Sequence, residues 1–257
     1  MLNLKTVVRE AKTHFYQSFA NHRVPIKLNR AIISFTFDDV PRSAFTNAVP
    51  LLDKYGIKAT FYVSAGLSNP DNIAKENALD EYLRPDDLVN LNQNNHHLAC
   101  HTYSHYRLTD GNASKLYQDT QRNIDSLQVI LGDVPIEHFS YPFGQVSFEE
   151  KRLLAQQYKT MRSSRPGLNA GATDLYLLRA TSLYSSSFDK QAIENIIKKA
   201  VDLGGWLILY THGVETNPDA YGCSPEQFEW VLKQCVASGA DIQPIDKAYQ
   251  QIINQPA

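Results

Sequence analysis

The sequence of 257 residues has little of what marks several common classes of protein. Its three cysteines, Cys100, Cys223 and Cys235, form no Cys-x-x-Cys pair, and their odd number argues against a disulfide framework. The apolar run 206–210 is far too short to span a bilayer. These features predict a protein of a reducing compartment without a membrane span.

The charge balance and the absence of several well-known motifs exclude further classes of protein. The 25 basic and 27 acidic residues leave a net charge of −2, and the basic residues are scattered, so no nucleic-acid partner is expected. The chain has no Gly-x-Ser-x-Gly elbow of a serine hydrolase and no glycine-rich phosphate loop. Residues 1–15 lack the continuous apolar core of a signal peptide, which predicts a cytoplasmic location.

What is present is the pattern of an α/β protein with a single large domain. Short apolar runs alternate with longer helical patterns, as parallel βα units do. We expect an N-terminal helix and connector over 1–29 and the catalytic domain over 30–257. The predicted strands number about seven and cover 31–37, 58–65, 97–101, 138–142, 159–163, 177–184 and 206–212.

Helix signals lie between these runs. Ser147 and Ser224 are predicted N-caps, the second followed by a proline at the first helical position. The segments 113–132 and 189–205 have apolar residues at intervals of three and four, which is typical of helices packed on one side. His96 and His97 precede the third strand, and we expect them to be solvated.

Polar residues follow the predicted strands. The run FTFDDV ends the first strand with Asp38 and Asp39, the third strand ends at His101 with His105 four residues later, and His212 ends the last. In parallel α/β folds the active site lies at the carboxyl ends of the strands. These side chains are therefore predicted to converge at that end of the sheet.

Two imidazoles and one carboxylate form a familiar set for a catalytic zinc ion. Adjacent residues at a strand end point in different directions, so Asp38 and Asp39 are not expected to share one role. If Asp39 turns to the imidazoles as a metal ligand, Asp38 is left close to the metal-bound water, where a carboxylate can serve as general base. Alternatives remain: surface or structural histidines, or aspartates that cap the segment VPRSAF in competition with Ser43. Neighbouring carboxylates on a strand end do not suit a glycosidase, whose two carboxyl groups face one bond.

The motifs TFDD, HTYSH, SYPFG and LILYTHG, in this order from about Ala31 to Asp246, resemble those of the polysaccharide deacetylase family, the fourth family of carbohydrate esterases. The resemblance implies a distorted (β/α) barrel, usually with seven strands, and removal of N-acetyl groups from amino sugars. It implies a divalent metal, zinc first, with cobalt, nickel or manganese as alternatives. It assigns the metal to Asp39, His101 and His105, the base to Asp38, the acid to His212, and an oxyanion contact to the Phe143 N–H.

The sequence also departs from the family pattern. Ser140 stands where the third motif usually has the arginine that orients the base, and Arg179, near the end of a later strand, is the predicted replacement. Tyr210 stands where a leucine usually lines the acetyl pocket, and it either narrows the pocket or points elsewhere. The aspartate that usually pairs with the acid histidine has no clear match; Asp174, Asp189 and Asp202 are all possible.

The function predicted from these residues is metal-dependent N-deacetylation of an acetylated amino sugar. The expected cytoplasmic location suggests an intermediate of surface-glycan or lipopolysaccharide assembly, either small, oligosaccharidic or lipid-linked. One alternative is a deformylase or a hydrolase of a cyclic amide. Another is a metal- or glycan-binding protein on a degenerate deacetylase scaffold. The sequence leaves the oligomeric state open.

Overall fold

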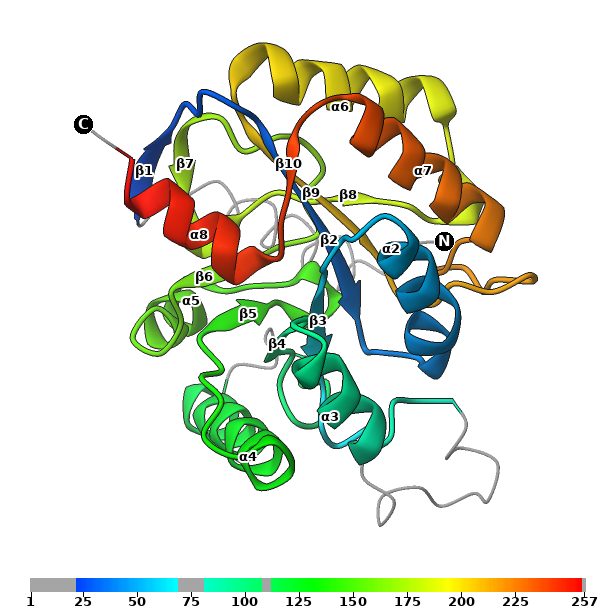
Figure 1. The fold of residues 1–257 in the computed structure, drawn as a ribbon. Helices are drawn as coiled ribbons and strands as arrows, with labels where there is room; N and C mark the ends of the chain where they lie inside the picture. The colour runs from blue at the N-terminus through cyan, green and yellow to red at the C-terminus, as the bar shows by residue number, and fades with distance from the viewer. Residues whose placement is uncertain (1–21, 69–80, 108–111, 256–257) are drawn as a thin grey trace, which may run out of the picture.

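A computed structural model describes residues 22–68, 81–107 and 112–255, and its centre is a curled sheet of parallel strands (Figure 1). The main path runs β6-β5-β4-β3-β2-β9-β8, and β10 pairs with the start of β2. The strands are β2 Ile32–Asp38, β3 Thr60–Val63, β4 His97–Cys100, β5 His138–Ser140, β6 Thr160–Arg162, β8 Thr181–Ser182, β9 Trp206–Thr211 and β10 Asp241–Ile242. The predicted distorted (β/α) barrel is confirmed.

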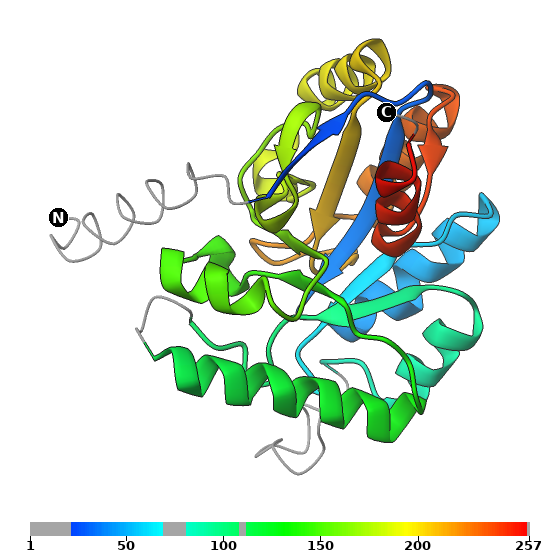
Figure 2. The same cartoon turned by 90° about the vertical axis from the view of Figure 1, so that its left-hand side faces the viewer.

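Helices cover the outside of this sheet (Figures 1 and 2). They are α2 Val49–Lys54, α3 Pro85–Gln93, α4 Ala113–Leu131, α5 Phe148–Leu154, α6 Lys190–Leu203, α7 Pro225–Ala237 and α8 Ile245–Ile253. Both predicted caps are confirmed, because Ser147 Oγ accepts from Glu150 N–H and Ser224 Oγ accepts from Gln227 N–H. Helix α8 covers the end of the barrel at which the strands begin, where Ile245 N–H donates to Thr60 Oγ1.

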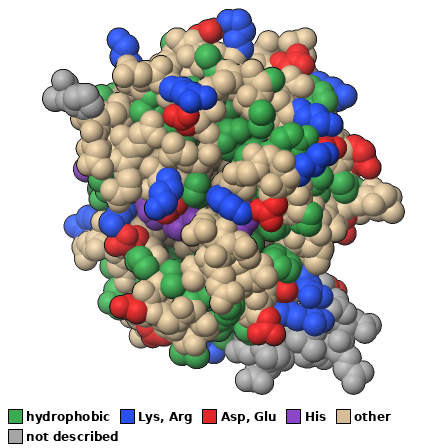
Figure 3. Space-filling model, viewed as in Figure 1, with side chains coloured by type: hydrophobic (Ala, Val, Ile, Leu, Met, Phe, Trp, Pro, Cys, Tyr) green, Lys and Arg blue, Asp and Glu red, His purple; other side chains and the backbone are tan. Residues whose placement is uncertain are grey.

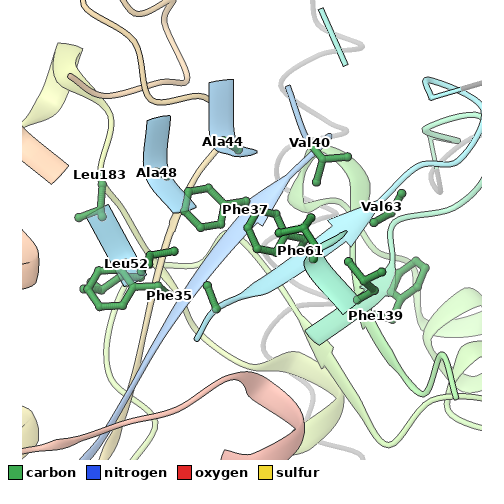
Figure 4. Close-up of a cluster of buried hydrophobic side chains, with 14 of the residues drawn as sticks. Phe35, Phe37, Val40, Ala44, Ala48, Leu52, Phe61, Val63, Phe139 and Leu183 are labelled. Carbon is green, nitrogen blue, oxygen red and sulfur yellow. The ribbon is translucent and has the colours of Figure 1, made fainter. Parts of the chain in front are cut away.

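Alternation along β2 divides the core into two clusters. Ile33, Phe35 and Phe37 pack outward against the helices, where Figure 4 shows Phe37 beside Phe61. Ile32 faces the barrel interior. The whole strand is buried, as expected of a central parallel strand covered on both faces. The inward register from Ile32 ends at Asp38, which therefore points into the barrel at its carboxyl rim.

The predicted strand 177–184 is only partly regular, yet it closes the barrel. Leu178 bridges to β6, and β8 pairs with β9 three residues later. The segment thus spans the gap between the two edges of the sheet without forming one continuous strand.

An antiparallel pair outside the barrel was not predicted. Strand β1, Arg23–Ile26, pairs with β7, Gly171–Asp174, so part of the expected connector 1–29 is a strand. The N-terminal helix predicted before it falls on residues 1–21, outside the described part of the chain.

The described residues show neither a membrane-spanning helix nor, on the face in Figure 3, a patch of one charge. None of the helices there is both long and apolar enough to cross a membrane. On the face in Figure 3, acidic and basic side chains are interspersed rather than gathered by sign.

Candidate metal and hydrolytic site

Asp39, His101 and His105 meet at the carboxyl rim of the barrel. The Oδ1 atom of Asp39 lies 3.2 Å from Nε2 of His101 and 3.2 Å from Nε2 of His105. One ligand atom from each residue lies within 4.8 Å of the others. The structure therefore brings together the three predicted metal ligands from two strand ends and the loop that follows β4.

The hydrogen bonding of this cluster fits a cation. His101 Nδ1 lies 2.8 Å from the carbonyl oxygen of Ser140, which only accepts, so Nδ1 carries the proton and the lone pair of Nε2 faces Asp39. Asp39 Oδ1 is buried and has no hydrogen-bond donor among the described residues. A buried carboxylate oxygen facing imidazole lone pairs is costly unless a positive charge joins them, and this donor set suits zinc.

The histidine loop is held by helix α4. Asp119 Oδ2 accepts hydrogen bonds from the N–H groups of Tyr103, at 2.8 Å, and Ser104, at 3.0 Å, and Oδ1 accepts from Ser104 Oγ at 2.7 Å. Thr102 Oγ1 accepts from Tyr106 N–H at 2.8 Å. These bonds fix the turn that carries the second histidine toward the first.

Backbone strain is concentrated in the site. Five of the six non-glycine residues with positive φ in the described chain lie in its motifs: Asp39, Val40, Thr102, His105 and Phe143. Left-handed conformations of non-glycine residues cost free energy and persist where the surroundings enforce them. The turn at Asp39 is what directs its carboxylate away from that of Asp38.

The charges in the cluster act on one another. Burial favours the neutral form of Asp39, but contact with His101 and the potential of the neighbouring histidines outweigh it and lower the pKa of Asp39 far below its usual value. Burial opposes protonation of His101, yet the two aspartates raise its pKa. Burial and the charge of His101 lower the pKa of His105 to about 4. Both His105 and Asp39 thus favour the protonation state that binds a metal.

Asp38 is held by Arg162, not by Arg179. The Nη2 group of Arg162 donates to both carboxylate oxygens of Asp38 and to Ser140 Oγ, and Arg162 is 2% exposed. Arg179 instead donates from Nη1 to the Pro166 carbonyl, at 3.0 Å, and does not line the site pocket. The prediction for Arg179 is therefore corrected: its guanidinium lies over the 165–168 loop, while the buried arginine on β6, Arg162, reaches Asp38.

A signal for Arg162 was present in the sequence. In the strand TMR the outer position, Met161, packs toward the helices, so Thr160 and Arg162 face inward. The register pairs Arg162 with Ser140, the position of the missing motif arginine. A charged residue at an inward position of a buried strand needs a partner, and Asp38 at the same level is one.

His212 lies on the other side of Asp39, with its Nε2 3.6 Å from Asp39 Oδ2. Its Nδ1 lies 3.2 Å from the main-chain oxygen of Tyr221, which fixes the tautomer and leaves Nε2 toward the site. The partner of His212 is thus a carbonyl. The three aspartates considered for this role are engaged elsewhere: Asp174 with Lys151, Asp189 as the cap of α6 and Asp202 with Lys198.

The alternative roles of the first motif are not supported. Ser43 precedes a helical turn at Ala44–Ala48 without a side-chain capping bond, and its hydroxyl donates to Glu215 at 3.0 Å. Neither aspartate caps this turn, because both are engaged at the rim.

These groups open onto one pocket of about 350 Å³. Its wall combines the polar groups above with aromatic residues: Tyr141, Phe143, Tyr184, Tyr210 and Tyr221. Phe143 is 48% exposed, and its ring centroid lies 4.3 Å from that of His105 with the two rings tilted by 50°. The Arg107 guanidinium lies over the Phe143 ring, 3.7 Å from its centroid. The pocket has room for a sugar-sized ligand beside the predicted metal ligands.

Comparisons with known proteins identify the family and the fold of the chain. A family model described as polysaccharide deacetylase matches residues 26–161, and the chain belongs to that family. It is 27% identical over 121 residues to a bifunctional xylanase/deacetylase of Pseudobutyrivibrio xylanivorans. That stretch covers 46% of this chain but only 18% of the relative.

Solved structures show the same fold at low identity. PdaA of Bacillus subtilis, a family 4 carbohydrate esterase, has a TM-score of 0.60 at 15% identity, covering 94% of this chain and 88% of its own. A family 4 acetyl xylan esterase from Clostridium thermocellum, solved with a cobalt ion, has a TM-score of 0.57 at 18% identity over 86% and 91%. A mutant of the pseudoenzyme BA3943 from the same family has a TM-score of 0.61 at 12% identity over 89% and 72%.

Proposed function

We propose that this protein is a metal-dependent N-deacetylase of an N-acetylated amino sugar. The observation that carries the proposal is the buried Oδ1 of Asp39, which lies 3.2 Å from each of two imidazoles and has no hydrogen-bond partner in residues 22–68, 81–107 and 112–255. Beside it, Asp38 is held by the buried Arg162. Membership of the polysaccharide deacetylase family supports the substrate class.

Asp39, His101 and His105 would hold the metal, with zinc first among the divalent ions. A zinc ion bound there would supply Lewis acidity, which polarises an amide carbonyl and favours deprotonation of water.

The side chains around the pocket have separate parts in hydrolysis. Asp38, oriented by Arg162, takes a proton from the attacking water as the new oxygen–carbon bond forms. The Phe143 N–H donates to the oxygen of the tetrahedral intermediate. The imidazolium form of His212, which keeps its Nδ1 proton on the Tyr221 carbonyl, then delivers its Nε2 proton to the nitrogen as the carbon–nitrogen bond breaks, releasing acetate and the free amine. The proton taken up by Asp38 balances the one that His212 gives up.

The proposal is tested by acetate release. Purified protein with zinc is incubated with N-acetylated amino sugars in free, oligosaccharide, nucleotide-linked and lipid-linked forms. Acetate is expected from at least one of them, and a chelator should stop its release. A metal-loaded protein that releases no acetate from any substrate would overturn the proposal.

Replacing the base separates catalysis from binding. Asp38→Asn should lower kcat by roughly 100-fold or more because the amide cannot take the proton from water. Zinc affinity should stay near that of the wild type, since Asp38 is not among the predicted ligands. Full activity in Asp38→Asn would remove Asp38 from the mechanism.

The similarity to the pseudoenzyme makes a non-catalytic protein the second candidate. A binding protein would keep its glycan or metal affinity in Asp38→Asn and show no turnover with either acetyl or formyl substrates. Parallel detection of formate with formamido sugars identifies the deformylase alternative in the same experiment.

A further inference from the structure

The guanidinium of Arg162 lies between two tyrosine rings. Its central carbon is 4.7 Å from the ring centroid of Tyr210 on β9 and 5.1 Å from that of Tyr62 on β3. The alternation of side chains along β2 explains why the rings lie beside Arg162. Tyr62 pairs with Asp38, and Tyr210 pairs with Thr36, the preceding inward-facing residue of the same strand. Both rings therefore reach the interior of the barrel at the level of the base.

The hydrogen bonds of Arg162 leave part of its orientation open. All contacts with Asp38 and Ser140 come from the single atom Nη2, while Nη1 reaches only the carbonyl of Ser163, at 3.2 Å. The Nε atom is buried and has no partner among the described residues. These bonds anchor Nη2 and Nη1 at the edge of the guanidinium, and the two neighbouring rings add contacts to the planar group itself.

Tyr210 is itself held in place. It is 6% exposed, and the ring of Tyr184 packs edge-on against it with centroids 5.4 Å apart. Tyr184 also contacts the His212 ring at 5.7 Å. The Tyr210 ring is thus wedged between Tyr184 and Arg162 and is not free to turn into the pocket.

We propose that Tyr210 and Tyr62 are positioning residues that hold the Arg162 guanidinium in the plane from which it orients Asp38. Tyr210 then does more than line the pocket: Ser140, Arg162 and Tyr210 act as one unit, with the serine hydroxyl leaving room for the arginine that enters from β6. The catalytic consequence rests on the proposed deacetylase function, but the ring–guanidinium contact does not.

The kinetic test compares two substitutions at one position. Tyr210→Phe keeps the ring and should retain most of the turnover, whereas Tyr210→Leu removes it and should lower kcat about tenfold through the misplaced base. KM should change less than twofold, and zinc content should equal that of the wild type. Equal kcat for the leucine and phenylalanine variants, or a loss confined to KM, would overturn the proposal.

A second measurement needs no activity. Arg162→Ala opens a space between the rings that is continuous with the pocket, and free guanidinium ion at millimolar concentration should bind there. Calorimetry should show at least tenfold weaker guanidinium binding in Arg162→Ala/Tyr210→Leu than in Arg162→Ala/Tyr210→Phe. Equal binding by the two would overturn the proposal.

The two measurements separate the possible failures. If the wild-type protein has no deacetylase activity, the proposed function fails. The binding of guanidinium ion to the two double variants then still tests the contact between the rings and Arg162. If the alanine variants do not fold, which circular dichroism reveals, the kinetic comparison of Tyr210→Phe with Tyr210→Leu decides alone.

Discussion

At the scale of single residues, the site is defined by which atoms lack an ordinary partner. Asp39 Oδ1 has no hydrogen-bond partner within the described part of the chain, although it is buried, and Nδ1 of His101 donates to the Ser140 carbonyl. In the neutral ring the single proton is therefore on Nδ1, and the lone pair of Nε2 is left for a metal ion.

The first prediction concerns the metal. The purified protein should hold one divalent ion per chain, and His101→Ala should weaken its affinity by about 100-fold or more, because two ligands are too few for a stable zinc site. Metal analysis and competition with a chelator measure this. His22→Ala is a matched control, because His22 is exposed and lies outside the site; equal metal loss in both variants would contradict the assignment.

Residue-scale chemistry also explains why Cys100 has no part in the site. Burial raises the pKa of Cys100 to about 11, which leaves the thiol neutral, as the outward register of β4 predicts. Trp206 is likewise buried, and its indole N–H donates to Ser34 Oγ at 2.9 Å, so it belongs to the core rather than to the wall of the candidate site.

At the scale of elements, strand alternation and one helix together position the site. The strands deliver Asp38, His101 and Arg162 inward at one level, but His105 lies on a loop that no strand orders. Helix α4 provides that order through the three hydrogen bonds to Asp119.

We therefore expect Asp119→Ala to weaken zinc binding about 10- to 100-fold, although Asp119 does not contact the metal ligands directly, because the loop loses its anchor. Affinity is measured by chelator competition at constant pH. Asp125→Ala, on an exposed turn of the same helix, is the control. Unchanged affinity in Asp119→Ala would show that strand ends alone fix the histidines.

At the scale of the whole molecule, the two ends of the barrel differ in their histidines. Those at the rim are candidate ligands, whereas His96, His97 and His138 lie at the opposite end and are largely buried. The prediction that His96 and His97 are solvated was wrong. A left-handed turn at Asn95 brings the His96 ring under Phe61, where Nδ1 accepts from Ala59 N–H, and α8 covers His97.

This burial makes the stability of the fold depend on pH. Burial lowers the pKa of His96 and of His97 to about 4, so the folded state resists protonation that the unfolded chain accepts near pH 6.5. The contribution of each neutral histidine to the free energy of unfolding is fully present above pH 6.5 and is lost as the pH falls toward 4. The total loss is roughly 3 kcal/mol per histidine.

Denaturant unfolding at several pH values, with zinc present, measures this dependence. The free energy of unfolding should fall steeply between pH 6.5 and 4.5. His96→Asn, whose side-chain oxygen can still accept from the Ala59 N–H, should reduce the number of protons taken up on unfolding, which the slope measures, by about one. His22→Asn should leave the slope unchanged. A flat profile, or equal slopes in both variants, would contradict the assignment.

Local patterns were sufficient to predict the main parallel strands, the caps at Ser147 and Ser224, and the convergence of Asp39, His101, His105 and His212, because side-chain alternation and parallel pairing act over a few residues and place strand ends on one rim. They did not predict the antiparallel pair β1–β7 or the short strand β10. Only the tertiary structure decided that Arg162 rather than Arg179 reaches Asp38, that a Tyr221 carbonyl serves His212, and that His96 and His97 are buried. Those outcomes depend on contacts between segments 9 to 124 residues apart, and an isolated arginine, carbonyl or histidine in the sequence does not indicate which distant group will neutralise or cover it.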